Sequence, residues 1–553
     1  MTDSTQSINK FTQRFLSGTL LSRLTGMVRD IAMAYAFGTH AAVAAFMVAF
    51  RLSQLPRRLL GEGALQSAFV PQFEELRKSG HARAYTFFFN LSIALSLLLL
   101  IIVGVTCAGI GGWLAFGALS PGNGEIAYLT LLMMPGLLFI CLYGLNTALL
   151  QCEKSYFIGS AAPIAFNLVW IAAAVTLGKF TPEAAMPWLS AAIVIGCLCQ
   201  WLITVPRVIS KFRQQFGAEG FHLFSSIDLR SKDLAKLIKP LLLSIMGVAA
   251  AQVNSALDPL FARYADPEGP ALLWYALRIQ QLPLALFGIA LSGALLPPLT
   301  RAIKAKDTAN FCLFLSFAIR RCSGLLLPIT FGIVVLGDAC INVLYGRGDF
   351  TDYSTAQTTQ CLWAYAAGLL PMALVLVLAP AFYAQSNYRI PTIASLLSVA
   401  INLFLNTVMI VFLGCGAAGI AWATSLAAWF NVLYLAYALQ KIYAVNVLSS
   451  LTGWNSCKVL AAGLTATLGT LGLQYAFWSN TGQAIPAWSI VWGITPSLPR
   501  AFIAQFMYAA VAGLSFLAIL LAAAWLYRAE DILSQFAMLF SRAKNKSAEG
   551  NLP

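Results

Sequence analysis

Long apolar segments follow one another along almost the whole chain, and short polar segments separate them. A helix needs about 20 mainly apolar residues to cross a bilayer, and by this measure the chain contains about fourteen such segments. Their approximate limits are 12–37, 41–70, 84–116, 125–151, 156–177, 184–205, 235–263, 269–300, 310–337, 356–385, 388–413, 416–440, 456–478 and 500–527. The second and eighth segments are the least apolar. This pattern predicts an all-α polytopic membrane protein.

The composition agrees with this prediction. Of the 553 residues, 59% are hydrophobic and 10% are charged, whereas a soluble protein has about 25% charged residues. The net charge is +14, but the basic residues gather in alternate loops, which is typical of membrane topology and not of a nucleic-acid surface. The 11 cysteines form no CxxC motif and the 3 histidines are isolated, so we expect no metal site, no resident cofactor and no nucleic-acid partner.

The placement of lysine and arginine predicts the orientation of the chain. Basic residues are frequent in every second loop, for example at Arg77, Lys78 and Arg83 and throughout 206–234. The intervening loops contain few, such as Lys179. By the positive-inside rule both termini are cytoplasmic, which requires an even number of spans.

Two spacings repeat within the chain and predict two related halves. Gly61 and Pro71 have counterparts 227 residues later, at Gly288 and Pro298. A Gly-Leu-Leu run that precedes a tyrosine recurs with an offset of 232 residues. Each offset contains six segments, an even number, so the halves form a parallel repeat, an arrangement of transporters with a site between two lobes.

The repeat divides the chain into five predicted parts. An N-terminal six-helix lobe and a C-terminal six-helix lobe are joined by a cytoplasmic linker, and two extra transmembrane helices and a cytoplasmic tail follow. In this order the limits are 1–205 for the first lobe, 206–234 for the linker, 235–444 for the second lobe, 445–530 for the extra helices and 531–553 for the tail.

Charged residues lie at membrane depth in a few of these segments. A charge at the bilayer centre costs about 2.5–3.5 kcal/mol on insertion scales, and such residues usually face the interior of a bundle or a wet cavity. They are Arg23, Arg29 and Asp30 in the first segment, Arg51, Arg57, Arg58 and Glu62 in the second, Asp258 in the seventh, Arg278 in the eighth, and Arg320 and Arg321 in the ninth. Arginine predominates, mainly in the opening helix pairs of the two halves, which we expect to face each other.

Two simpler explanations account for only some of these charges. Long side chains such as Arg57 and Arg58 can reach the headgroup region, and Arg58 and Glu62 have the spacing of an ion pair on one helix face. Neither explanation removes the surplus of arginine. Guanidinium groups bind phosphate oxygens bidentately, so the surplus predicts a cavity for an anionic, phosphate-bearing cargo.

Four stretches of the chain resemble the MurJ/MviN family. They are "SRLTGMVRD" (22–30), "VAFRLSQLPRRLLGEGALQSAFVP" (48–71), "GALLPPL" (293–299) and "VLAPAFYAQSNYRIP" (377–391). Members of this family belong to a superfamily of multidrug and polysaccharide exporters and move lipid II, the undecaprenyl-diphosphate-linked peptidoglycan precursor, from the inner to the outer leaflet. The resemblance implies two six-helix lobes around a central cationic cavity, alternating access, and a lipid-tail groove lined by the two extra helices.

The resemblance also assigns residues to the cavity. By motif position, Arg29, Arg57 and Arg278 are expected to bind the diphosphate, and Arg23 to help order the site. Glu62 matches the family motif as well. Asp30, Glu62 and Asp258 are possible counter-charges to these arginines.

The chain departs from the family pattern at two acidic positions. Ala44 and Leu277 stand where the family commonly has aspartate, whereas Asp258 stands where an uncharged polar residue is usual. One hypothesis is that Asp258 takes over part of the counter-charge role for Arg278. The alternative is that Asp258 caps a broken helix end before Pro259.

These observations predict a lipid II flippase of the bacterial cytoplasmic (inner) membrane. Its partners are expected to be lipid II, membrane lipids and the cell-wall synthesis machinery. No GxxxxGK[ST] motif is present, so the energy must come from an ion gradient, the membrane potential or the metabolism of the cargo. The alternatives are an exporter of another polyprenyl-diphosphate-linked glycan, a drug/cation antiporter, or a scaffold without transport. An enzyme is the least favoured, because no nucleophile–base constellation is evident.

Overall fold

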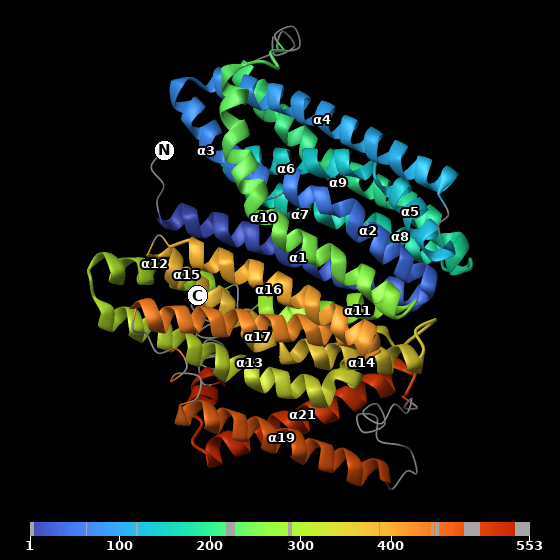
Figure 1. Ribbon diagram of the computed structural model, residues 1–553, viewed down its shortest axis with the longest axis vertical. Coiled ribbons are helices and arrows are strands. Elements are labelled where there is room, and N and C mark those ends of the chain that lie inside the picture. The colour runs from blue at the N-terminus through green and yellow to red at the C-terminus, as the bar shows by residue number, and fades with distance from the viewer. Residues whose placement is uncertain are drawn as a thin grey trace, which may run out of the picture. The chain divides into compact units, whose positions relative to one another are not determined.

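The computed structural model describes residues 5–61, 63–117, 120–216, 227–285, 290–385, 387–443, 447, 449, 453–479 and 498–536, and these residues form helices and connections without a strand. The chain divides into two compact units, Met1–Arg263 and Tyr264–Pro553. The first unit contains α1 (Thr5–Phe37), α2 (Ala41–Leu60), α3 (Ala64–Ser79), α4 (His81–Phe116), α5 (Pro121–Met133), α6 (Gly136–Cys152), α7 (Tyr156–Ala161), α8 (Pro163–Leu177), α9 (Pro182–Phe216) and nearly all of α10 (Lys232–Ala265) (Figure 1).

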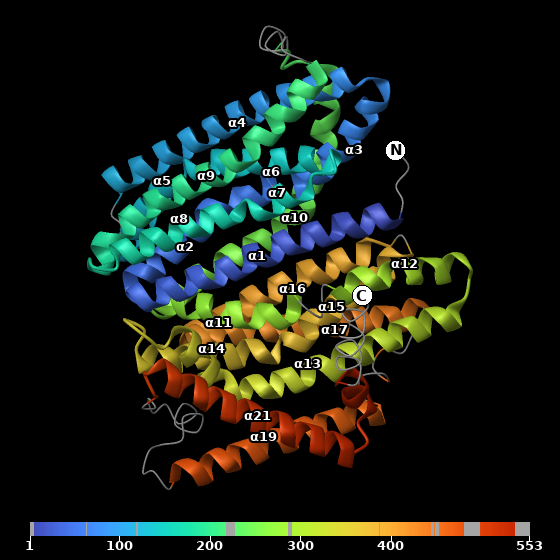
Figure 2. The same cartoon turned by 180° about the vertical axis from the view of Figure 1, so that it is seen from behind.

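The second unit contains the remaining described helices (Figure 2). They are α11 (Gly269–Pro283), α12 (Ala290–Lys304), α13 (Thr308–Tyr345), α14 (Asp352–Ala367), α15 (Leu369–Tyr383), α16 (Arg389–Thr407) with the π-helical η3 (Val408–Phe412), α17 (Gly416–Tyr443), α19 (Trp454–Ser479) and α21 (Phe502–Leu526).

The predicted all-α, multi-span membrane fold is confirmed. In the part of the chain that the structure describes, 9 helices are long and apolar enough to cross a membrane, and the bent pair α5–α6 raises this to 10. Each of the other predicted segments is helical as well, at α1, at α2–α3, at α10 and at α11–α12. These four contain most of the predicted membrane-depth charges, which explains why they are less apolar. The total of fourteen spans stays a prediction.

The helices follow the same order twice, as the predicted repeat requires. A long helix, a pair of shorter helices, a long helix and a second pair occur as α1, α2–α3, α4 and α5–α6, and again as α10, α11–α12, α13 and α14–α15. Residues 286–289, between α11 and α12, lie outside the described residues. The pairs α7–α8 and α16–η3 then precede the long helices α9 and α17. The compact units do not follow this repeat, because most of α10, its first element in the second half, groups with the first unit. The predicted domain limits rest on the repeat and stay a prediction.

The predicted segment 41–70 is not one continuous helix. α2 ends at Leu60 and α3 begins at Ala64. The break follows from a close approach between two backbones: a Cβ atom on Gly144 of α6 would lie 2.2 Å from the carbonyl oxygen of Gly61. In addition, Gly63 has a φ of 75°, which favours glycine. α2 therefore ends where Gly61 packs closely against Gly144 of α6 and Gly63 adopts a positive φ.

α13 lies at the centre of the second unit. It packs against α12, α14 and α15 on one side and against α19 and α21 on the other. Two apolar cores result, one around Leu374 and Val377 of α15 and one around Val335 of α13 and Phe516 of α21. The two helices outside the repeat are thus attached to the second unit through α13.

Candidate functional site

Arg29 is buried inside the first unit, and its guanidinium group contacts a carboxylate, an amide and an indole ring. Its side chain lies 4.5 Å above the ring of Trp170 in α8. It forms an ion pair with Asp30 at 2.7 Å, and its Nη1 donates to Oδ1 of Asn167 at 3.1 Å. Arg29 and Asp30 are only 7% and 2% exposed. The ion-pairing explanation, which the sequence offered for Arg58, thus applies to Arg29.

Asn167 connects α8 to α1 by three hydrogen bonds. Besides accepting from Arg29, it donates to the carbonyl oxygen of Ser22 at 3.1 Å and to Oγ1 of Thr25 at 3.0 Å. The neighbouring Trp170 is enclosed by Phe46, Phe50 and Phe166, whose ring centroids lie 5.0–5.7 Å from its own. Asn167 and Trp170 are not among the residues predicted from the sequence. The signal available was an amide and an indole one turn apart inside an otherwise apolar segment.

The other predicted residues of the first unit differ in their surroundings. Arg23 is exposed on α1, with no hydrogen-bond or ion-pair partner among the described residues. Arg57 is half-buried on α2. Ala44, at the first departure from the family pattern, is fully buried. Glu62 lies outside the described residues.

Asp258 is half-buried on α10. The alternative that it caps a helix end is wrong, because α10 continues through Pro259 to Ala265. Its suggested role as a counter-charge for Arg278 stays a prediction.

In the second unit Arg278 is half-buried on α11, beside Leu277. Its guanidinium group lies 4.5 Å above the ring of Trp274, one turn earlier on the same helix. The face of an indole attracts a cation by about 0.5–2 kcal/mol, depending on exposure. Arg29 and Arg278 thus share one kind of contact, a guanidinium carbon 4.5 Å from the centroid of a tryptophan ring.

Polar side chains attach α10 to the other helices of the first unit along its length. The contacts are Arg263 Nη1 to the carbonyl oxygen of Ala41 at 2.8 Å, Arg51 Nη1 to Ser255 Oγ at 2.7 Å, Arg58 Nη1 to Gln252 Oε1 at 3.0 Å, Ser67 Oγ to Ser244 Oγ at 3.1 Å, and Arg83 to both carboxylate oxygens of Asp233 at 2.9 Å. Two arginines of the predicted surplus, Arg51 and Arg58, therefore donate to α10.

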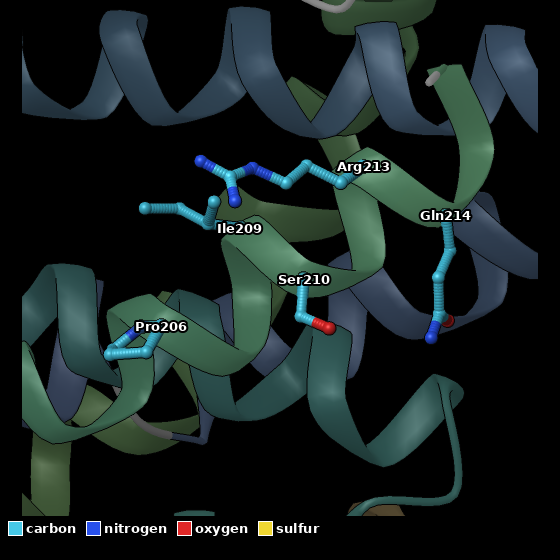
Figure 3. Close-up of a pocket in the computed structure, with 5 residues that line it drawn as sticks. All are labelled: Pro206, Ile209, Ser210, Arg213 and Gln214. Carbon is cyan, nitrogen blue, oxygen red and sulfur yellow. The ribbon is translucent and has the colours of Figure 1, made fainter. Parts of the chain in front are cut away.

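A cavity of about 530 Å³ opens at the C-terminal end of α9 (Figure 3). Pro206, Ile209, Ser210, Arg213 and Gln214 line it. None of the predicted site residues belongs to this lining. Elsewhere in the described part of the chain, no three His, Cys, Asp or Glu side chains gather as metal ligands do.

Comparison with known proteins places this arrangement in a family. The family model described as "Lipid II flippase MurJ" matches residues 33–485. The chain belongs to the MurJ family. A probable lipid II flippase MurJ of Chlamydia pneumoniae is 31% identical over 539 residues, 96% of this chain and 95% of that relative. A probable lipid II flippase MurJ of Vibrio cholerae is 29% identical over 81% of this chain and 86% of that relative.

Solved structures agree with the family at the level of the fold. A lipid II flippase MurJ in an inward closed conformation matches with a TM-score of 0.69 and 22% identity, over 93% of this chain and 98% of that structure. An inward-facing multidrug resistance MATE family transporter of the MOP superfamily matches with a TM-score of 0.59 and 13% identity, over 78% of this chain and 98% of that structure. The MurJ structure covers more of this chain, including the part beyond the repeat. The MurJ family is named for lipid transport and is not a family of enzymes.

Proposed function

We propose that this MurJ-family protein moves lipid II from the inner to the outer leaflet of the bacterial inner membrane, with both termini in the cytoplasm. The observation that supports this most directly is the family match over most of the chain, together with arginines at membrane depth in α1, α2 and α11. Guanidinium groups suit a diphosphate because each can offer two parallel N–H donors. The protein acts by alternating access, with no resident cofactor and no chemical step on the cargo.

The four predicted arginines have unequal roles in this proposal. Arg57 and Arg278 each bind phosphate oxygens, and Arg23, which is exposed, helps to order the site. Arg29 is buried against Asp30 and Asn167, so it reaches a phosphate only when the cargo oxygen replaces one of these acceptors. When the cargo oxygen replaces the neutral oxygen of Asn167, Asp30 stays beside the guanidinium group, whereas displacing Asp30 would leave a bare buried carboxylate.

The lipid part of the cargo requires an apolar surface. α21 exposes large apolar side chains along most of its length, among them Ile503, Val511 and Leu514, which are 62–77% exposed. In the proposed function α19 and α21 accommodate the polyprenyl tail. Membrane lipids and the cell-wall synthesis machinery are the further partners.

Complementation tests the proposal. A bacterium depleted of its own lipid II flippase receives this chain, and an externally added probe measures lipid II in the outer leaflet. We expect growth and labelled lipid II with the wild type. A well-expressed wild type that leaves lipid II inaccessible contradicts the proposal and favours another polyprenyl-diphosphate-linked glycan.

A matched pair of variants tests the role of the cavity arginine in the second unit. Arg278 lies 4.5 Å above Trp274, and Arg347 lies in a similar way, 4.8 Å above Phe502. Both Arg→Ala variants lose one positive charge and one ring contact. Arg278→Ala is expected to abolish labelling while Arg347→Ala retains it, and equal effects contradict a specific role for Arg278.

A further inference from the structure

The last turns of α9 contain three basic side chains, and their surroundings differ. Lys211 is 19% exposed and its Nζ lies 3.5 Å from a carboxylate oxygen of Glu153. Arg207 and Arg213 are exposed, and neither forms an ion pair within the part of the chain that the structure describes. Glu153 is also paired with Arg77 at 3.4 Å, so it does not balance the two exposed arginines. The end of α9 therefore presents positive charge to its surroundings.

Arg213 belongs to the cavity of about 530 Å³ at this end of α9. The described lining changes from apolar, at Pro206 and Ile209, to polar, at Ser210, Arg213 and Gln214. The side chains of Ile209 and Arg213 extend in the same direction (Figure 3), as expected of residues one turn apart. The described lining thus combines an apolar part with one positive charge, and it contains no carboxylate.

The cavity begins where α9 is expected to leave the hydrocarbon layer. The predicted span 184–205 is long enough to cross that layer, which needs about 20 residues. Near its end Leu202 and Ile203 are 45% and 47% exposed, as is typical of side chains that face lipid. From Pro206 to Arg213 the helix rises about 10 Å. The guanidinium group therefore reaches the headgroup region, which is about 5–8 Å thick on each side of the bilayer.

The donors of the cavity suit a phosphate group. A guanidinium group binds two phosphate oxygens with parallel N–H donors, and the hydroxyl of Ser210 is a further donor. Oε1 of Gln214 accepts from Nζ of Lys211 at 3.3 Å, which leaves the amide N–H groups of Gln214 as donors. Because the described lining offers no carboxylate, it has no partner for the ammonium group of a zwitterionic lipid. One positive charge balances one phosphodiester.

We propose that this cavity binds the headgroup of an anionic phospholipid of the phosphatidylglycerol type. The phosphodiester lies against Arg213, and an acyl chain follows the exposed apolar side chains of Ile209, Pro206 and Ile203 along α9. In the orientation proposed above, this end of α9 faces the cytoplasmic leaflet, whose anionic lipids attract basic residues. The bound lipid fixes the end of α9 at the membrane surface. The site is separate from the arginines assigned to the cargo.

Photocrosslinking of the full-length protein in nanodiscs locates the site. The nanodiscs consist of phosphatidylcholine with a small fraction of phosphatidylglycerol that has a photoreactive acyl chain, and mass spectrometry maps the crosslinked peptides. We expect crosslinks in the later part of α9. Photoreactive phosphatidylcholine at the same mole fraction is expected to label this part several-fold less. No lipid II is present, so the result does not depend on the proposed cargo.

Two exposed arginines supply a matched pair of variants. Arg213 lines the cavity, whereas Arg230 is exposed before α10 and does not belong to the described lining. Each Arg→Ala variant removes one positive charge from an exposed position. Arg213→Ala is expected to lower phosphatidylglycerol crosslinking on α9 about tenfold, and Arg230→Ala to leave it unchanged. Arg213→Lys, which keeps the charge without the paired donors, is expected to retain part of it.

The inference fails if both photoreactive lipids label α9 of the wild type equally, because the cavity then holds bulk lipid. It also fails if Arg213→Ala retains full crosslinking. Equal losses in Arg213→Ala and Arg230→Ala contradict a specific site and indicate a general effect of surface charge. Size-exclusion chromatography confirms that each variant is folded before it is compared.

Discussion

Arg29→Ala is expected to destabilise the protein for a reason unrelated to cargo. The substitution leaves the carboxylate of Asp30, which is 2% exposed, without the guanidinium group 2.7 Å away. Removing one partner of a buried ion pair costs about 3–5 kcal/mol, because the remaining charge is uncompensated. The lost contact with the ring of Trp170 adds to this cost.

The double variant Arg29→Ala/Asp30→Asn separates the charge from the contact. It removes both members of the pair and leaves no bare carboxylate, so the hydrogen bond to Asn167 and the ring contact are lost without the cost of an unpaired charge. We expect a net cost of about 1–2 kcal/mol. The double variant is therefore more stable than Arg29→Ala alone, with a coupling energy of about 2 kcal/mol or more.

Fluorescence-detected size-exclusion chromatography after heating measures this order of stabilities. The wild type should survive the highest temperature, the double variant an intermediate one and Arg29→Ala the lowest. A double variant that is no more stable than Arg29→Ala refutes the reasoning, since the two side chains are then uncoupled. Arg29→Lys, which keeps the charge but not the fork, is expected to lie close to the double variant.

In the lipid II assay, the same double variant distinguishes a cargo-binding role of Arg29 from a structural role. If it is stable but leaves lipid II inaccessible, Arg29 acts on the cargo. If it transports normally, Arg29 is a structural residue of the first unit.

Three further predictions follow from particular contacts. Gly144→Val is expected to prevent close packing of α2 on α6 and to lower the yield of folded protein in size-exclusion chromatography, whereas Gly104→Val, where nothing lies within 4 Å of the added Cβ, is tolerated. Trp274→Leu is expected to lower lipid II labelling by removing about 1–2 kcal/mol of attraction for Arg278, and Trp274→Phe to retain most of it. Asp307 caps the N-terminus of α13, and hydrogen bonds from Asn310 to its carboxylate lower the pKa of that carboxyl group. The carboxylate therefore contributes fully to stability at neutral pH, and this contribution is lost as the pH falls through the lowered pKa. Melting temperatures of the wild type and Asp307→Asn, compared between pH 3 and 7, are expected to show this loss in the wild type.

The sequence predicts the helices well and the contacts between them poorly. Apolar segments locate each span because a bilayer demands about 20 apolar residues of any helix. The break at Gly61 was missed because it depends on the close approach of α6, which no local pattern records. Asn167 was missed for the same reason, since its partners lie 138–145 residues earlier in the chain.

The charge available to a cargo in the first unit is smaller than a count of arginines suggests, and it depends on α10. Arg29 is engaged by Asp30, and Arg51 and Arg58 donate to Ser255 and Gln252 of α10. Because these last two contacts are hydrogen bonds to neutral side chains, each contributes only about 1 kcal/mol and breaks readily. In the proposed function, a movement of α10 away from α2 breaks both of these contacts together, so the position of α10 is expected to influence how strongly α2 attracts a diphosphate.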